Sequence, residues 1–189
     1  MTIPENQLRR WSQLGAQVRS QRTCESIRNA LARHEWPPAM GSPSVYLQGS
    51  YRNHTNIAGD SDVDVVAESS DVFYDNLTPE ERRLRGFQPG RYTWENFRNE
   101  VYGALATHYS LGKVRLGNKC IHVGGAGDRL NADVIPCCEY RAYGAGGYAK
   151  GITFWTQSGI QVVNYPQLHY EHGMAKNKRT LEVFEEAGL

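Results

Sequence analysis

Two aspartates that alternate with valines, Asp62 and Asp64, constrain the fold of this chain more than any other feature. In a strand, residues two apart share a face, so both carboxylates point one way while Val63 and Val65 point into a core. Two carboxylates on one face repel each other unless a cation lies between them. Oxygen ligands on a rigid element suit Mg²⁺, which usually takes one or two carboxylates plus substrate phosphates. The segment therefore predicts a metal-dependent phosphoryl- or nucleotidyl-transfer site.

The length of the chain and its charge limit the kind of partner. A chain of 189 residues can build one core, or one domain with a small appendage. The formal net charge is only +1. Such a balance argues against strong duplex nucleic-acid binding, which neutralises many phosphates. It is compatible with free nucleotides, whose charge a metal ion and a few basic residues can balance.

No segment of the sequence indicates a membrane or an export signal. No run approaches the roughly 20 apolar residues of a membrane span, and residues 1–7 lack the apolar core of a signal peptide. The four cysteines, at positions 24, 120, 137 and 138, have no C-x-x-C spacing. We interpret them as reduced cysteines, which predicts a cytoplasmic protein without membrane contact.

Hydrophobic spacing predicts a mixture of helices and strands, an α/β (α+β) protein. Residues 69–90 lack a clear period and are expected to be irregular, apart from a short helix capped by Thr78 with Pro79 in its first turn. The glycine-rich residues 144–147 are expected to be a mobile link. The expected helices are 5–35, 93–109 and 166–189, and the expected strands are 45–48, 62–68, 113–116, 119–123, 130–136, 151–156 and 160–163.

Two further features strengthen the metal-site hypothesis. Gly49 and Ser50 follow the first strand, where glycine lets the backbone approach a phosphate and serine can donate a hydrogen bond to it. Asp133 lies in the apolar strand 130–136, and burying a carboxylate there is costly unless it is paired or metal-bound. If this strand lies beside strand 62–68, three carboxylates converge and could hold two ions.

These motifs together resemble the polymerase-β-type nucleotidyltransferase signature of Gly-Ser, Asp-x-Asp and a third Asp on a separate strand. Residues 47–66 and 164–178 are more closely similar to the bacterial CD-NTases, the cGAS-like cyclic di- and oligonucleotide synthases of antiphage signalling. The resemblance implies a polymerase-β-like core with a mixed, mostly antiparallel sheet and packed helices.

The resemblance also implies a role for each matching residue. Asp62, Asp64 and Asp133 would be catalytic and would bind Mg²⁺, or Mn²⁺ in its place. The implied nucleotide-binding residues are Gln48, Gly49, Ser50, Lys176, Asn177 and Lys178. A solvated basic helix end explains Lys176 and Lys178 about as well.

The family comparison divides the chain in two. Residues 1–165 would form the catalytic core, and residues 166–189 the start of a C-terminal helical lobe that is otherwise missing from this sequence. The sequence also has His172 before Gly173, where the family has Asn. A homodimer could compensate for the missing lobe.

The implied activity is a Mg²⁺-dependent nucleotidyl transfer from nucleoside triphosphates, with release of pyrophosphate. The expected product is a cyclic di- or oligonucleotide second messenger for antiphage defence. One alternative is a small transferase that places a nucleotide on a protein, a tRNA or a small molecule. Another is a non-catalytic nucleotide-binding module, although the three intact aspartates argue against it.

The histidines give weaker signals. His169 and His172 are three residues apart on an expected helix, but the sequence places no third ligand with them. His122 lies in an alternating strand and is interpreted as a core-edge or substrate-facing residue.

Overall fold

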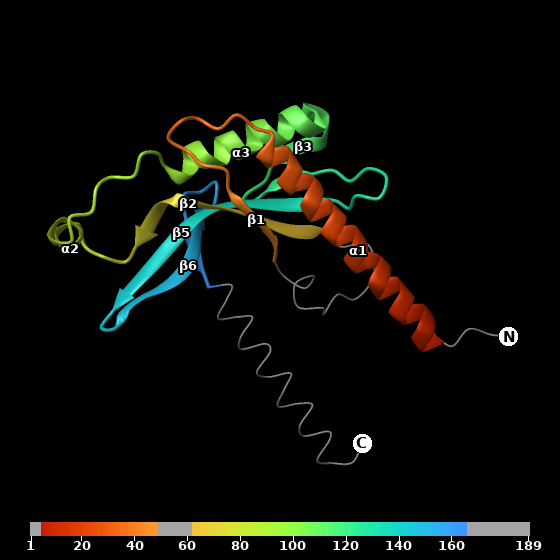
Figure 1. Cartoon of the computed structure of the whole chain (residues 1–189), viewed down its shortest axis with the longest axis horizontal. Coiled ribbons are helices and arrows are strands. Elements are labelled where there is room, and N and C mark those ends of the chain that lie inside the picture. Colours follow the sequence, from red (N-terminus) through yellow and green to blue (C-terminus); the bar gives the residue numbers. More distant parts are fainter. Residues whose placement is uncertain (1–4, 49–61, 166–189) are drawn as a thin grey trace, which may run out of the picture.

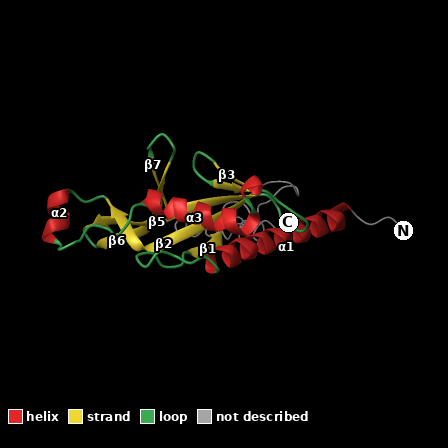
Figure 2. Ribbon diagram, turned by 90° about the horizontal axis from the view of Figure 1, so that it is seen from above, coloured by secondary structure: helices red, strands yellow, loops and turns green. Residues whose placement is uncertain are grey.

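A curved sheet with two long helices on one face forms the body of the protein (Figures 1 and 2). The computed structural model describes residues 5–48 and 62–165. In the view of Figure 1, α3 runs above the sheet and α1 descends obliquely beside it. The helices are α1 (Glu5–Ala32), α2 (Pro79–Leu84) and α3 (Trp94–Tyr109), with a 3₁₀ turn at Leu111–Lys113. The strands are β1 (Ser44–Leu47), β2 (Val63–Asp75), β3 (Val114–Leu116), β4 (Ile121–Val123), β5 (Ala132–Gly144), β6 (Gly147–Trp155) and β7 (Gln161–Asn164).

The order of the strands places β2 and β5 side by side in the middle of the sheet. The main path is β1-β2-β5-β4-β3, and β6 pairs with β5 and with β7. One edge of β5 is therefore shared, with β4 near its start and β6 near its end. The β2–β5 pair is parallel, and the other described pairs are antiparallel. This arrangement confirms the predicted mixed, mostly antiparallel sheet.

Helix α3 is positioned by a capping box and an apolar stripe. The Thr93 side chain accepts a hydrogen bond from the backbone N–H of Asn96, whose side chain accepts one from the backbone N–H of Thr93. Phe97, Val101 and Leu105 follow at helical spacing and are fully buried. The predicted helix 93–109 is confirmed within a residue at its start.

The core lies between the helices and the sheet. Ile27 and Leu31 of α1 are fully buried, as are Val63 and Val65 of β2. The alternation predicted for residues 62–65 is thus confirmed for the three that lie in β2, because Val63 and Val65 enter the core and leave Asp64 on the other face. Asp62 immediately precedes the strand.

The prediction that residues 69–90 are irregular is wrong for its first part, because β2 continues to Asp75. Partners distant in sequence hold its polar residues in the sheet: the hydroxyls of Ser69 and Tyr92 lie 2.6 Å apart, and Tyr92 donates to Asp71 across 3.2 Å. The Thr78 cap and α2 are confirmed. Local alternation cannot reveal contacts of this kind.

The glycine-rich residues 144–147, expected to be a mobile link, form the tight turn of the β5–β6 hairpin. Gly144 pairs with Gly147 in the antiparallel ladder, and Gly147 has a φ of 125°, which favours glycine. The predicted hairpin of residues 113–123 is confirmed as β3 and β4. No helix in the described part of the chain is long and apolar enough to cross a membrane. The helix expected at 166–189 lies outside the described residues.

Candidate active site

Asp64 and Asp133 are direct partners across the parallel β2–β5 pair. Paired residues in neighbouring strands project to the same face, so the two carboxylates stand side by side. Their strand neighbours Val63, Val65 and Val134 are fully buried on the helix-covered face. The aspartates therefore lie on the face opposite to α1 and α3. The two strands lie side by side, which is the condition under which the sequence predicted that the carboxylates converge.

Three more polar residues extend this pair into a row across β2, β5, β4 and β3, with the residue that follows β1 at one end. His122 of β4 is the partner of Asp133, and Arg115 of β3 is the partner of His122. On the other side, the backbone N–H of Gln48 donates to the carbonyl of Asp64 across 2.9 Å. The order across the face is Gln48, Asp64, Asp133, His122 and Arg115. The two carboxylates lie in the middle of this row, and the cation of Arg115 lies at one end.

The imidazole of His122 is hydrogen-bonded to Asp133, with Nδ1 and Oδ1 2.6 Å apart. The carboxylate accepts, so Nδ1 carries the donated proton. The side chains are 38% and 26% exposed, which leaves room for a ligand beside them. Gly117 makes the ring position possible, because a Cβ at this residue would lie 2.5 Å from Nε2 of His122.

The electrostatics of Asp64 suit a bound cation. Burial raises the pKa of the Asp64 carboxyl above its usual range, and the charges of Asp133 and Asp62 raise it further. A divalent ion held between these oxygens would reverse both effects, since it supplies the missing counter-charge. The donor set therefore fits Mg²⁺ or Mn²⁺.

Cys120 also belongs to this neighbourhood, on the same face as His122. Its Sγ lies 3.8 Å from Nε2 of His122. Burial raises the pKa of the Cys120 thiol to about 12, helped by the charge of Asp133, a hydrogen bond to it and the charge of Asp64. Sequence reasoning missed Cys120 and left the role of His122 open. The two-residue spacing of Cys120 and His122 signalled their shared face, but only the β4–β5 register brings them to Asp133.

The other predicted site residues fall into two groups. Asp62 is exposed and immediately precedes β2, close enough for its charge to act on Asp64. Gly49 and Ser50 lie outside the described residues, as do Lys176, Asn177 and Lys178. Their nucleotide-binding roles stay predictions.

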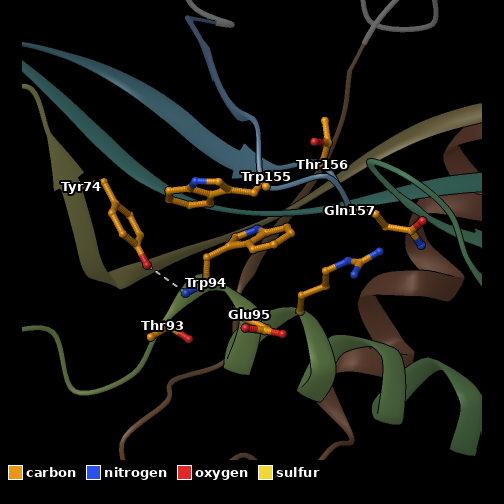
Figure 3. Close-up of a pocket in the computed structure, with 9 residues that line it drawn as sticks. Tyr74, Thr93, Trp94, Glu95, Trp155, Thr156 and Gln157 are labelled. Carbon is orange, nitrogen blue, oxygen red and sulfur yellow. Dashed lines mark hydrogen bonds between the residues drawn. The ribbon is translucent and has the colours of Figure 1, made fainter.

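A separate cavity of about 430 Å³ lies on the helix-covered face (Figure 3). Trp94 of α3, Trp155 of β6 and Tyr74 of β2 form its aromatic wall, and the Tyr74 hydroxyl accepts a hydrogen bond from the Trp94 backbone N–H across 2.9 Å. The side chain of Trp155 projects to the same face as that of Thr153, the partner of Cys138. Cys138 is five residues from Asp133, an odd number, so the cavity and the carboxylates are on opposite faces.

Known proteins similar to this chain are synthases of cyclic nucleotides. The chain is 48% identical over 191 residues to the cyclic UMP-AMP synthase of Rhodothermus marinus, covering 98% of this chain and 65% of that protein. It is 39% identical over 194 residues to the cyclic nucleotide synthase CdnE01 of Staphylococcus haemolyticus, covering 95% of this chain and 64% of that protein. No family model matches.

The chain belongs to the CD-NTase family.

Solved CD-NTase structures have the same fold. The Rhodothermus marinus CdnE c-UMP-AMP synthase, solved with Apcpp and Upnpp, superposes with a TM-score of 0.82 at 49% identity, covering 96% of this chain and 63% of that one. The Elizabethkingia meningoseptica CdnE synthase, solved with GTP and Apcpp, gives a TM-score of 0.67 at 27% identity, covering 97% and 62%. The polymerase-β-like fold is thereby confirmed. This CD-NTase chain spans a little under two thirds of the length of these relatives.

Proposed function

We propose that this CD-NTase chain joins nucleoside triphosphates by nucleotidyl transfer, releases pyrophosphate and makes a cyclic di- or oligonucleotide messenger. The observation that carries the proposal is the side-by-side pairing of Asp64 and Asp133 on the open face of the sheet. The names of the relatives support it, because they are synthases of cyclic UMP-AMP and of other cyclic nucleotides. The analogues in the related structures, Apcpp and Upnpp, support nucleoside triphosphates as substrates.

Asp62, Asp64 and Asp133 would hold Mg²⁺, or Mn²⁺ in its place. When bound, the metal lowers the pKa of the attacking hydroxyl and stabilises charge at the reacting phosphate. Asp133 accepts the acceptor hydroxyl's proton, while Nδ1 of His122 keeps the Asp133 carboxylate oriented. The backbone of Asp64 is held by the β2–β5 ladder and by a hydrogen bond in which the Gln48 N–H donates to the Asp64 carbonyl.

The remaining nucleotide contacts come from residues that flank the row. Gln48, Gly49 and Ser50 would bind the donor phosphates or sugar, since they follow β1 in the sequence and the Gln48 N–H donates to the Asp64 carbonyl. Lys176, Asn177 and Lys178 would contribute further nucleotide contacts. Residues 1–165 act as the catalytic core in this proposal, and residues 166–189 belong to a helical lobe that a second copy of the chain could complement.

The cellular setting of the proposal is antiphage signalling in the cytoplasm. All four cysteines are free, and Cys24, Cys137 and Cys138 are buried. Free thiols of this kind suit a reducing compartment.

Incubation of the 189-residue protein with labelled ATP, GTP, CTP and UTP tests the proposal. In Mg²⁺ or Mn²⁺, we expect pyrophosphate and a phosphatase-resistant nucleotide product. Asp64→Asn should reduce product formation by at least about 100-fold, because it removes a carboxylate from the proposed metal site. Asp128→Asn is the matched control, since Asp128 is an exposed carboxylate paired with Arg22 away from the site.

A ligand-binding measurement separates catalysis from binding alone. A native-state ligand must raise the thermal midpoint, so nucleoside triphosphate with Mg²⁺ should do so in the wild type and less in Asp64→Asn. Tight binding without turnover would favour the non-catalytic module, and labelled nucleotide on an added protein or tRNA would favour the small transferase. Absence of both product and a midpoint shift would refute the proposal.

A further inference from the structure

Cys120, His122 and Asp133 bring a thiol, an imidazole and a carboxylate together on one face of the sheet. One ligand atom from each lies within 4.8 Å of the others. Among the described residues, these three side chains form a group with the composition of a transition-metal site. Cys120 directly precedes β4, His122 lies within it, and Asp133 is its partner on β5, so the ladder holds the group together.

The separations match a tetrahedral zinc site. Zn–S and Zn–N bonds of their usual lengths place the two donor atoms about 3.6 Å apart in a tetrahedron. Sγ of Cys120 lies 3.9 Å from Nδ1 and 3.8 Å from Nε2 of His122, so either nitrogen is close to the separation expected of two zinc ligands. Asp133 is already in contact with the ring, 2.6 Å from Nδ1, and would move apart by less than about 1 Å to share an ion with it.

The donor types distinguish this group from the carboxylates of Asp62 and Asp64. Thiolate sulfur and imidazole nitrogen favour Zn²⁺, whereas Mg²⁺ prefers oxygen ligands in an octahedron. All three side chains are half-buried, which shields the group but leaves an entry path. Three protein ligands leave the fourth position of the ion for water.

We propose that Cys120, His122 and Asp133 form a binding site for Zn²⁺ that competes with the catalytic metal site for Asp133. Cys120 binds as the thiolate and releases its proton to the solvent, and His122 binds as the neutral ring. A zinc ion here takes one carboxylate oxygen of Asp133 and opens its hydrogen bond to His122. Zinc thereby acts as an inhibitor; the inhibition rests on the proposed function, whereas zinc binding does not.

Calorimetric titration of the metal-free protein with zinc chloride tests binding without any turnover. We expect one zinc ion per chain, displaced by a chelator. Cobalt(II) provides an independent readout, because a thiolate ligand produces a near-ultraviolet charge-transfer band and tetrahedral geometry produces intense visible bands. Both cobalt signals should appear in the wild type and be lost in Cys120→Ser.

Four variants separate this site from other zinc ligands. Cys120→Ser and His122→Gln should each weaken zinc binding by at least about tenfold, as the loss of even an outer-shell partner can. Cys24→Ser is the matched control, because it replaces a thiol of α1 on the other side of the sheet, and it should leave zinc binding unchanged. Asp64→Asn should also retain zinc, because it keeps all three ligands. Thermal unfolding of each variant verifies that it is folded.

Inhibition is measured in the nucleotide-synthesis assay. Zinc should inhibit the wild type, and Cys120→Ser should need at least about tenfold more zinc for the same inhibition. Zinc binding that is equally strong in Cys120→Ser, or that is lost in Asp64→Asn, would overturn the proposed site. Zinc binding through Cys120 without inhibition would overturn the competition for Asp133. An inactive wild type that still binds zinc through Cys120 would refute the proposed function and leave the zinc site supported.

Discussion

Nδ1 of His122 lies 2.6 Å from Oδ1 of Asp133, on the side of β5 that faces away from Asp64. The Asp133 carboxylate therefore lies between an acidic neighbour on β2, which repels it, and a hydrogen-bond donor on β4, which orients it. Because Asp133 completes the proposed Mg²⁺ site and His122 orients Asp133, His122 should affect activity without binding the Mg²⁺.

We expect His122→Gln to lower kcat by about 10- to 100-fold, the usual effect of losing a partner that orients a ligand. The KM for nucleotide should change little, since the residue acts through Asp133. Steady-state kinetics at several Mg²⁺ concentrations should also show a weaker apparent affinity for Mg²⁺, because Asp133 is no longer oriented. His108→Gln is the control, because His108 is exposed on α3, and an equal effect of that variant would contradict the assignment.

Gly117→Ala should reproduce the loss seen in His122→Gln. The added Cβ would lie 2.5 Å from Nε2 of His122, so the ring must move and its bond to Asp133 must weaken. Gly112→Ala is the control, because a Cβ at Gly112 meets no atom within 4 Å. The double variant Gly117→Ala, His122→Gln should be no worse than His122→Gln alone; additive losses would show that Gly117 acts elsewhere.

Asp64→Asn should stabilise the metal-free protein at neutral pH while abolishing activity. Burial and the charges of Asp133 and Asp62 raise the pKa of Asp64 in the folded state, so the ionised carboxylate there opposes folding. Each 1 kcal/mol gained in the free energy of unfolding raises the Tm of a chain of this size by about 2–4 °C.

The pH dependence of this gain follows from the sign of the shift. Stability of the wild type falls as the pH rises from the unfolded pKa of Asp through the raised folded pKa, and Asp64→Asn lacks this loss. The two proteins should therefore converge below about pH 4, as measured by scanning calorimetry with a chelator present. A lower midpoint for Asp64→Asn at neutral pH would contradict the repulsion.

Lys150→Met should destabilise the fold by about 1 kcal/mol, because Glu68 and Glu139 lose the half-exposed cation that they share, while Glu139 keeps its ion pair with Arg141. Nζ of Lys150 lies 3.1 Å from Glu68 and 3.5 Å from Glu139, whose side chains are 11% and 9% exposed. Burial lowers the pKa of Lys150, but the bonds and charges of Glu68 and Glu139 outweigh it and raise the pKa overall.

Urea unfolding measures this contribution. Because the folded pKa is raised, the stabilisation is complete below the ordinary lysine pKa of 10.5 and is lost as the pH rises through the folded value. Lys113→Met, at an exposed lysine, should change stability by no more than about 0.5 kcal/mol. A Lys150→Met effect that persists unchanged in strong alkali would show that the ion pairs contribute nothing.

The sequence predicts the acidic centre of the site but not its surroundings. Alternation alone assigns Asp62 and Asp64 to one face, and the cost of a carboxylate in an apolar strand marks Asp133. Their adjacency follows from the family resemblance, and the parallel β2–β5 ladder confirms it. Pairing of His122 with Asp133 depends on the antiparallel register of a strand three residues long, which no local pattern specifies.

Long-range hydrogen bonds account for what the sequence misses in the fold. Ser69 and Asp71 read as loop residues, yet both contact the hydroxyl of Tyr92 and remain in β2. The strand β5 extends past its apolar part because β6 supplies an antiparallel edge from Cys138 to Gly144. Ser69 and Asp71 contact a residue more than 20 positions away, and the β5–β6 ladder joins residues as far apart as Cys138 and Thr153. The local period of a strand does not reveal such partners.

The irregularity in the β2–β5 ladder, between Ser69 and Phe73, divides the ladder into two segments with different registers. Register upstream of it fixes Asp64 against Asp133, and register downstream fixes only the arm that ends at Gly144 and Gly147. The register of the arm is thus set separately from the register that pairs the carboxylates. A fluorescent or affinity reporter inserted at the tip of that hairpin is therefore expected to leave the pairing of Asp64 with Asp133 intact.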